Sequence, residues 1–154
     1  MDAQIGIEKK NRAETAKILN RILADEYVFL VKAKNYHWNV VGPDFSELHK
    51  LFDEQYEKVS GFVDDVAERV RSLNETAAGT LAEFQTMATL KEKAGKPGSA
   101  MQMIENLLKD HEQIIRNLRQ DLRDTAEKYG DMGTSDFLTG LMEDHEKMAW
   151  MLRA

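Results

Sequence analysis

The sequence predicts an all-α protein, built as a four-helix bundle with a short extra helix in the connection between the second and third long helices. Apolar residues repeat at helical spacing in four long segments, as expected for helices that bury one face. The chain has two prolines, Pro43 and Pro97, and each lies beside a glycine between two such segments. Capping patterns at the starts of three predicted helices agree with these boundaries.

The first two long helices are predicted to form a hairpin. The first covers about 8–38, where apolar side chains form a stripe with a period of about 3.6 residues. The stretch 39–43 ends it, because it contains a glycine followed by a proline. Asp44, with Glu47 three residues later, resembles a capping box and predicts a second helix over about 44–73.

The second half of the chain is predicted to contain one short and two long helices. Two further capping boxes mark a short helix near 81–90 and a third long helix near 100–128. These boxes pair Thr80 with Glu83 and Ser99 with Gln102. The last helix is predicted to start after Gly130 and Gly133, and its apolar stripe is wide enough to pack against the other three.

The length of 154 residues suits one domain, 1–154, with one hydrophobic core. The first residues are polar and lack the apolar stretch of a secretory signal. No run of about 18 apolar residues occurs anywhere in the chain. We therefore expect a cytoplasmic protein that does not enter a membrane.

The residue types narrow the chemistry. The chain has no cysteine, which excludes disulfides, thiolate metal sites and thiol nucleophiles. Any metal ion must therefore be held by histidines and carboxylates. The net charge of −6 disfavours a basic groove for nucleic acid over the whole molecule and suits the binding of cations.

Four residues of types that bind metal ions stand out in the predicted hairpin: His37, His49, Asp64 and Glu68. His37 lies six residues before Pro43 and His49 six residues after it. An antiparallel hairpin therefore brings both imidazoles to a similar level. The two carboxylates are four residues apart, which places them on one face of the second helix.

The two pairs cannot bind one ion within a single chain if the second helix is straight. His49 and Asp64 are fifteen residues apart, or about 22 Å at a rise of about 1.5 Å per residue. If two copies of the helix pack antiparallel about a two-fold axis near Tyr56 and Glu57, His49 of one subunit lies level with the carboxylate pair of the other. This arrangement predicts two shared sites per dimer, with ligands that suit Fe(II) and can also bind Zn, Mn or Co.

The run YHWNVVGPDFSELHKLFDEQYEKVSGFVDDVAERVRSL, residues 36–73, resembles the signature region of the Dps family, the mini-ferritins of the ferritin-like superfamily. The predicted helix order extends the likeness to most of the chain. The resemblance implies a ferroxidase centre between two subunits, formed by His37, His49, Asp64 and Glu68. It also implies that Asp53 is a further or neighbouring metal contact, and on a helix Asp53 lies one turn beyond His49.

The same resemblance implies an activity. Dps proteins typically assemble as dodecameric shells, prefer hydrogen peroxide as the oxidant of Fe(II) and store ferric mineral in the cavity. We therefore expect a homo-oligomeric ferroxidase and iron-storage protein that handles Fe(II)/Fe(III) and protects against oxidative stress.

Some Dps proteins hold DNA with a lysine-rich arm at the amino terminus, and this sequence departs from that pattern. Residues 1–7 contain no Lys or Arg, and the small cluster of Lys9, Lys10 and Arg12 is flanked by glutamates. We expect DNA binding to be weak or absent, because too few phosphates could be neutralised.

Two other functions are open at this point. One is a structural DNA-packing (nucleoid) protein in which the metal site only stabilises the assembly. The other is a plain helical oligomer in which His37 caps a helix end and Asp64 and Glu68 belong to a solvated face. A Glu-x-x-His site inside one bundle, as in larger ferritins, lacks support because no histidine has a Glu three residues before it.

Five more residues have two interpretations each. His111 and His145 lie in apolar stripes, and we interpret them as hydrogen-bonded core histidines rather than ligands. Trp38 is predicted to pack at the end of the hairpin, while the resemblance implies a ring that intercepts radical equivalents near the iron. Asp131 and Asp136 are candidates for an acidic pore that draws cations into a shell, and otherwise they are solubilising surface charges.

Overall fold

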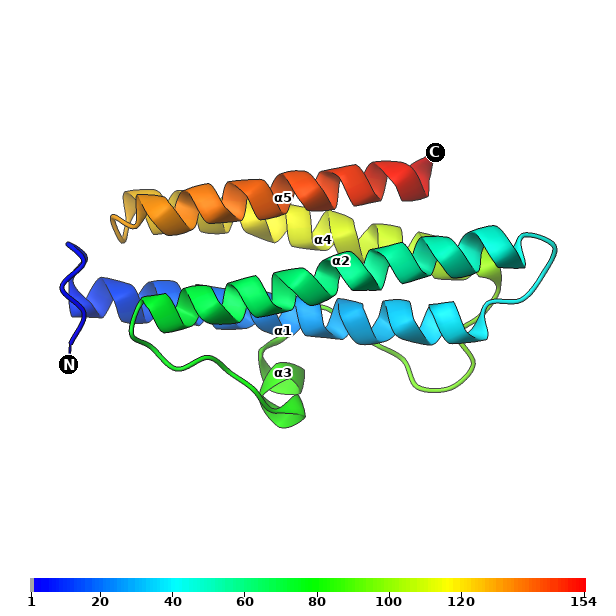
Figure 1. Ribbon diagram of the computed structural model, residues 1–154, viewed down its shortest axis with the longest axis horizontal. Coiled ribbons are helices and arrows are strands. Elements are labelled where there is room, and N and C mark those ends of the chain that lie inside the picture. Colours follow the sequence, from blue (N-terminus) through cyan, green and yellow to red (C-terminus); the bar gives the residue numbers. More distant parts are fainter. Residues whose placement is uncertain (1) are drawn as a thin grey trace.

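The computed structural model, which describes residues 2–154, contains five α-helices and no β-strand in that range. The helices are α1 (Lys9–Asn39), α2 (Phe45–Ser72), α3 (Leu81–Met87), α4 (Ala100–Glu127) and α5 (Met132–Arg153). Helices α1 and α2 form one antiparallel pair, α4 and α5 form another, and the two pairs stack as a bundle (Figure 1). The predicted four-helix bundle with a short extra helix is confirmed.

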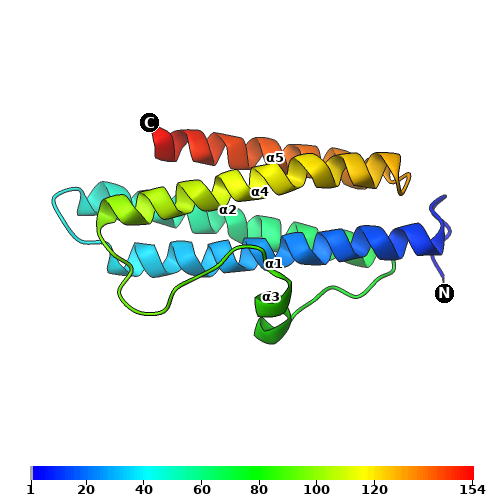
Figure 2. The ribbon, with the colours of Figure 1, turned by 180° about the vertical axis from the view of Figure 1, so that it is seen from behind.

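The connection between α2 and α4 crosses the length of the bundle. Helix α2 ends near the amino-terminal end of α1, and α4 begins at the opposite end of the bundle (Figure 1). The two helices therefore run in the same direction. Helix α3 lies within this crossover on the outer side of α1 (Figure 2). Its buried residue, Phe84, stacks on Tyr27 of α1 with ring centroids 4.6 Å apart.

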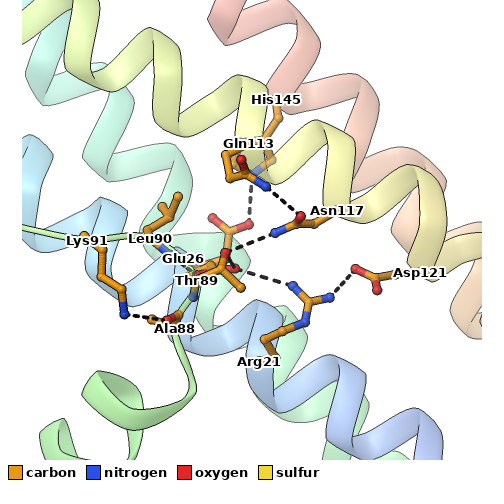
Figure 3. A network of polar contacts seen from close by, with 11 residues as sticks. Arg21, Glu26, Ala88, Thr89, Leu90, Lys91, Gln113, Asn117, Asp121 and His145 are labelled. Atoms are coloured by element: carbon orange, nitrogen blue, oxygen red, sulfur yellow. Dashed lines mark hydrogen bonds and ion pairs between the residues drawn. The ribbon is translucent and has the colours of Figure 1, made fainter.

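A buried aspartate of α1 anchors the segment that follows α3. Asp25 accepts hydrogen bonds from the backbone nitrogens of Thr89 and Leu90, at 2.6 and 2.9 Å, and from the Thr89 hydroxyl at 2.8 Å. Arg21 links this cluster to Asp121 of α4 (Figure 3). Because these bonds satisfy two backbone donors outside a helix, the crossover is held against α1 without helical structure.

All three predicted helix starts are confirmed, and two of the three predicted capping boxes form. The boxes of Thr80 with Glu83 and of Ser99 with Gln102 each make both reciprocal hydrogen bonds. Asp44 is the N-cap of α2, as predicted, but its side chain makes no cap hydrogen bond, so the predicted capping box is wrong. Its backbone, at φ −95° and ψ 21°, differs from the extended conformation that turns an N-cap side chain toward the first free N–H groups.

Two predicted boundaries also differ from the structure. The short helix ends at Met87 instead of near residue 90, because Asp25 binds the next backbone donors. The last helix begins at Met132, with Asp131 as its N-cap, so Gly133 lies inside its first turn. Within residues 2–154, no helix has both the length and the apolar character needed to span a bilayer.

The bundle core is mainly apolar and encloses a polar cluster. The largest fully buried side chains include Phe29, Phe52, Leu19, Leu23, Leu107, Leu118 and Leu138. Among them lie four buried polar side chains, one from each long helix: Glu26, Gln55, His111 and His145. The two histidines are joined through Nδ1 atoms 2.8 Å apart, His111 Nε2 lies 2.7 Å from Gln55 Oε1, and His145 Nε2 lies 2.9 Å from Glu26 Oε1. The prediction of hydrogen-bonded core histidines is confirmed.

His111 is fully buried within this chain of contacts, where a charged imidazole would lose its hydration. Burial, and next the neighbouring His145, lower the pKa of His111 well below its usual value of 6.5, so His111 stays neutral.

We expect the free energy of unfolding to fall as the pH is lowered below about 6.5. Below that pH the unfolded chain binds a proton at His111 and the folded protein does not, so this group alone contributes up to about 1.4 kcal/mol per pH unit. Denaturant unfolding between about pH 7 and pH 5.5 measures the slope. The variant His111→Gln, which cannot titrate there, is expected to lose this part of it. An equal slope in both proteins would contradict the assignment.

Candidate metal centre

The turn between α1 and α2 brings two histidines together. The rings of His37, near the end of α1, and His49, in the second turn of α2, stack with centroids 3.7 Å apart and planes 20° apart. Each Nδ1 lies 2.8 Å from the backbone carbonyl oxygen of the other histidine. The prediction that both imidazoles lie at one level of the hairpin is confirmed.

These reciprocal hydrogen bonds determine where each ring carries its proton. A carbonyl oxygen can only accept, so each Nδ1 carries the hydrogen and donates it. The carbonyl of His37 is one of the last four of α1, which have no partner inside the helix, and His49 satisfies it. In a neutral imidazole this leaves the lone pair of Nε2 free for a metal ion, with the ring orientation already fixed.

Asp53 lies one turn after His49 on α2, close to the histidine pair. Its Oδ1 is 4.0 Å from Nδ1 of His37 and accepts a hydrogen bond of 2.5 Å from the Tyr56 hydroxyl. That hydrogen bond, followed by burial, raises the pKa of Tyr56 to about 12. The phenol is therefore protonated at neutral pH and remains a donor to Asp53.

The two other predicted ligands lie elsewhere on α2. This helix is uninterrupted from Phe45 to Ser72, and the fifteen residues between His49 and Asp64 span about 22 Å. Both Asp64 and Glu68 are exposed. Within residues 2–154, no three or more His, Asp or Glu side chains converge closely enough to hold a metal ion. One chain therefore holds the predicted ligands in two separate places.

Comparison with known proteins identifies the family. A family model for the ferritin-like domain matches residues 16–154. The DNA protection during starvation (Dps) protein of Brevibacillus brevis is 39% identical over 139 residues, which cover 90% of this chain and 92% of that protein. The chain belongs to the Dps family.

Two further relatives extend the likeness over nearly the whole chain. An uncharacterized low temperature-induced protein of Nostoc sp. is 51% identical over 150 residues, which cover 97% of this chain and 84% of that protein. The crystal structure of a Dps protein from Vibrio cholerae O1, described as a member of a broad superfamily of ferritin-like diiron-carboxylate proteins, matches with a TM-score of 0.91 at 28% identity. That match covers 99% of this chain and 94% of the Vibrio chain.

In this Dps-family chain the side chain of Trp38 is open to solvent. It is 71% exposed, although it directly follows His37 in α1. The packing that we predicted for it is therefore not made within one chain. Because Trp38 lies beside a predicted ligand, the role of its ring in intercepting radical equivalents stays a prediction.

The structure gives Asp131 a structural role. It caps α5 by accepting hydrogen bonds from the Thr134 backbone nitrogen at 2.8 Å and the Thr134 hydroxyl at 2.6 Å. Arg69 of α2 donates to the same carboxylate at 3.0 Å, and only 1% of Asp131 is exposed. Because its charge is already neutralised inside the protein, this placement argues against the pore role predicted for Asp131. Asp136 is exposed and remains the candidate.

Two residues that hydrogen-bond to residues singled out in the sequence were not themselves identified from it. Tyr56 stands three residues after Asp53, a helical spacing that could have indicated their contact. No sequence spacing indicates the contact of Glu26, because its partner His145 is 119 residues away in the chain.

Two alanine variants at the start of α5 test the role of Asp131. We expect Asp131→Ala to lower the free energy of unfolding by about 2–3 kcal/mol, because it removes an N-cap and leaves the partly buried Arg69 unpaired. The matched variant Asp136→Ala removes an exposed charge and should change it by less than about 0.5 kcal/mol. Denaturant unfolding compares the two. Equal losses would show that Asp131 has no special structural role.

Proposed function

We propose that this protein is a ferroxidase and iron-storage mini-ferritin. It oxidises Fe(II) at sites shared between two subunits and stores the ferric product in a hollow shell of identical subunits. The observation that carries the proposal is the separation of ligand-type residues on one straight helix. Two histidines lie at one level near its start, and an exposed carboxylate pair lies about four turns later.

A second copy of the chain can complete the ligand set. When two α2 helices pack antiparallel, His37 and His49 of one subunit lie opposite Asp64 and Glu68 of the other. The histidines offer Nε2 lone pairs whose direction is set by the Nδ1 hydrogen bonds. Two imidazoles and two carboxylates with open coordination positions suit Fe(II), and Zn, Mn or Co can take its place.

In this proposal iron is the substrate, and the preferred oxidant is hydrogen peroxide. Each peroxide takes one electron from each of two Fe(II) ions and leaves as two hydroxide ions. The two electrons reach one peroxide, so no hydroxyl radical is released. The residues contribute ligand geometry and open positions through which the oxidant reaches the metal. Removal of Fe(II) and peroxide together protects the cell against oxidative stress.

The names of the relatives support this function in its coarser form. The Brevibacillus protein is named for DNA protection during starvation, and the Vibrio protein is described as belonging to the ferritin-like diiron-carboxylate proteins. Iron chemistry and protection are therefore the properties that we transfer to this chain. The dodecameric shell, the use of peroxide and a cytoplasmic location belong to the same proposal.

We propose that direct DNA binding is weak, which counts against the DNA-packing alternative. Arg12, one of the three basic residues near the amino terminus, is buried. Its guanidinium lies 2.6 Å from a carboxylate oxygen of Asp2 and donates to the carbonyls of Ala3 and Ile7 at 3.1 and 2.8 Å. It therefore holds the first residues against α1 and is not available to phosphate. The remaining exposed lysines of this cluster can neutralise few phosphates.

Stopped-flow kinetics of Fe(II) oxidation by peroxide tests the proposed function. We expect the double variant His37→Ala/His49→Ala to slow the reaction by about 100-fold, because it removes both nitrogen ligands. The variant Asp64→Asn should also slow it, whereas Asp65→Asn, which changes the neighbouring exposed carboxylate, should not. Size-exclusion chromatography checks that each variant assembles as the wild type does. Equal rates in the wild type and the histidine variant would refute the assigned site.

A further inference from the structure

Tyr56 contacts two residues of the proposed site, Asp53 and His37, and also Lys34, without being one of the expected ligands. Its hydroxyl donates to Asp53 Oδ1 at 2.5 Å. Its ring meets the ring of His37 edge to face, with centroids 5.3 Å apart and planes at 78°. The ammonium nitrogen of Lys34 lies 5.0 Å from the centre of the tyrosine ring. Contacts with α1 therefore hold the ring, and the hydroxyl acts within α2.

We infer that Tyr56 is a positioning residue, which holds Asp53 in the orientation that reaches a metal ion bound by His37 and His49. The inference rests on the proposed function, because it assigns a role in the same site. It concerns the hydroxyl and not the ring, since the ring contacts do not depend on the oxygen.

The need for such a residue follows from the exposure of Asp53. Its side chain is 44% exposed, and an aspartate on an open helix face can occupy several staggered rotamers. A hydrogen bond from a ring that is itself fixed selects one of them. With Oδ1 held by the phenol, Oδ2 is the oxygen available to the ion or to its bound water. Groups that orient ligands in this way typically change metal affinity by about 10–100-fold when they are removed.

Lys34 and His37 make the tyrosine a stable support. Both residues belong to α1, whereas Tyr56 and Asp53 belong to α2. The contact therefore links the carboxylate on one helix to the histidine on the other. Substitution of tyrosine by phenylalanine keeps the edge-to-face contact and the cation–ring contact, and removes only the hydrogen bond.

Cobalt(II) is a suitable probe, because it binds nitrogen and oxygen ligands and its visible absorption depends on coordination geometry. We expect Tyr56→Phe, in the assembled protein, to weaken Co(II) binding by about 10-fold or more and to change the visible spectrum. The matched control is Tyr36→Phe, which also removes a hydroxyl contact, the 3.1 Å hydrogen bond from Asn106, on the buried side of α1. This control should leave affinity and spectrum unchanged.

A double-mutant cycle separates positioning from a general structural effect. If the hydroxyl acts through Asp53, Tyr56→Phe should have little further effect on Co(II) binding once Asp53→Asn is present. If Tyr56→Phe and the wild type bind Co(II) with equal affinity and the same spectrum, while His37→Ala/His49→Ala binds it clearly more weakly, the positioning role is overturned. The proposed function then stays intact. If the wild type and the histidine variant bind Co(II) equally, the proposed site itself is wrong and this inference fails with it.

Discussion

The length of α2 is the constraint on which the account of this protein depends. The helix is uninterrupted over Phe45–Ser72, and it carries a histidine and a carboxylate pair, the predicted ligands, at positions about 22 Å apart. It cannot bend to bring them together, because from Phe52 to Val70 its inner face is packed into the core, through Val59, Phe62 and Val66 as well. A chain with this geometry can complete its ligand set only by pairing with another copy. Assembly is therefore a condition of the proposed iron chemistry.

The hairpin turn prepares one half of that ligand set. Gly42 adopts φ +130°, which favours glycine, and the turn brings the end of α1 beside the start of α2. The free carbonyl at the end of α1 and the imidazole on α2 then satisfy each other. Helix termination and ligand orientation are thus produced by the same hydrogen bonds. The other polar cluster, in the bundle core, is closed to solvent and joins all four long helices, so it serves the fold.

The sequence predicted those features that depend on residues near each other in the chain. The helical periodicity and the boxes at Thr80 and Ser99 are local, and they were confirmed. His37 and His49 were predicted to lie at the same level of the hairpin because they are equally far from the turn, and this prediction was confirmed as well. Asp44 is the N-cap of α2, but the capping box predicted there does not form, because such a box requires a backbone conformation that residue types alone do not determine.

Features that depend on distant partners could not be read from the sequence. The end of α3 depends on Asp25, which lies more than sixty residues earlier and binds the backbone of Thr89 and Leu90. The role of Asp131 depends on Arg69, and the buried Glu26 depends on His145. In each case a polar group is buried because a partner from a distant part of the chain satisfies it. The pairing of ligands between subunits remains a prediction, supported by their spacing on α2.

The most direct test of that pairing is complementation between two inactive variants. His37→Ala/His49→Ala lacks one half of the site, and Asp64→Asn/Glu68→Gln lacks the other. In a mixed dimer one site loses both halves and the other is intact, so random co-assembly should restore about a quarter of the wild-type rate of Fe(II) oxidation by peroxide. Such recovery is the predicted result. A co-assembled mixture that is no more active than either variant alone would contradict a site shared between subunits.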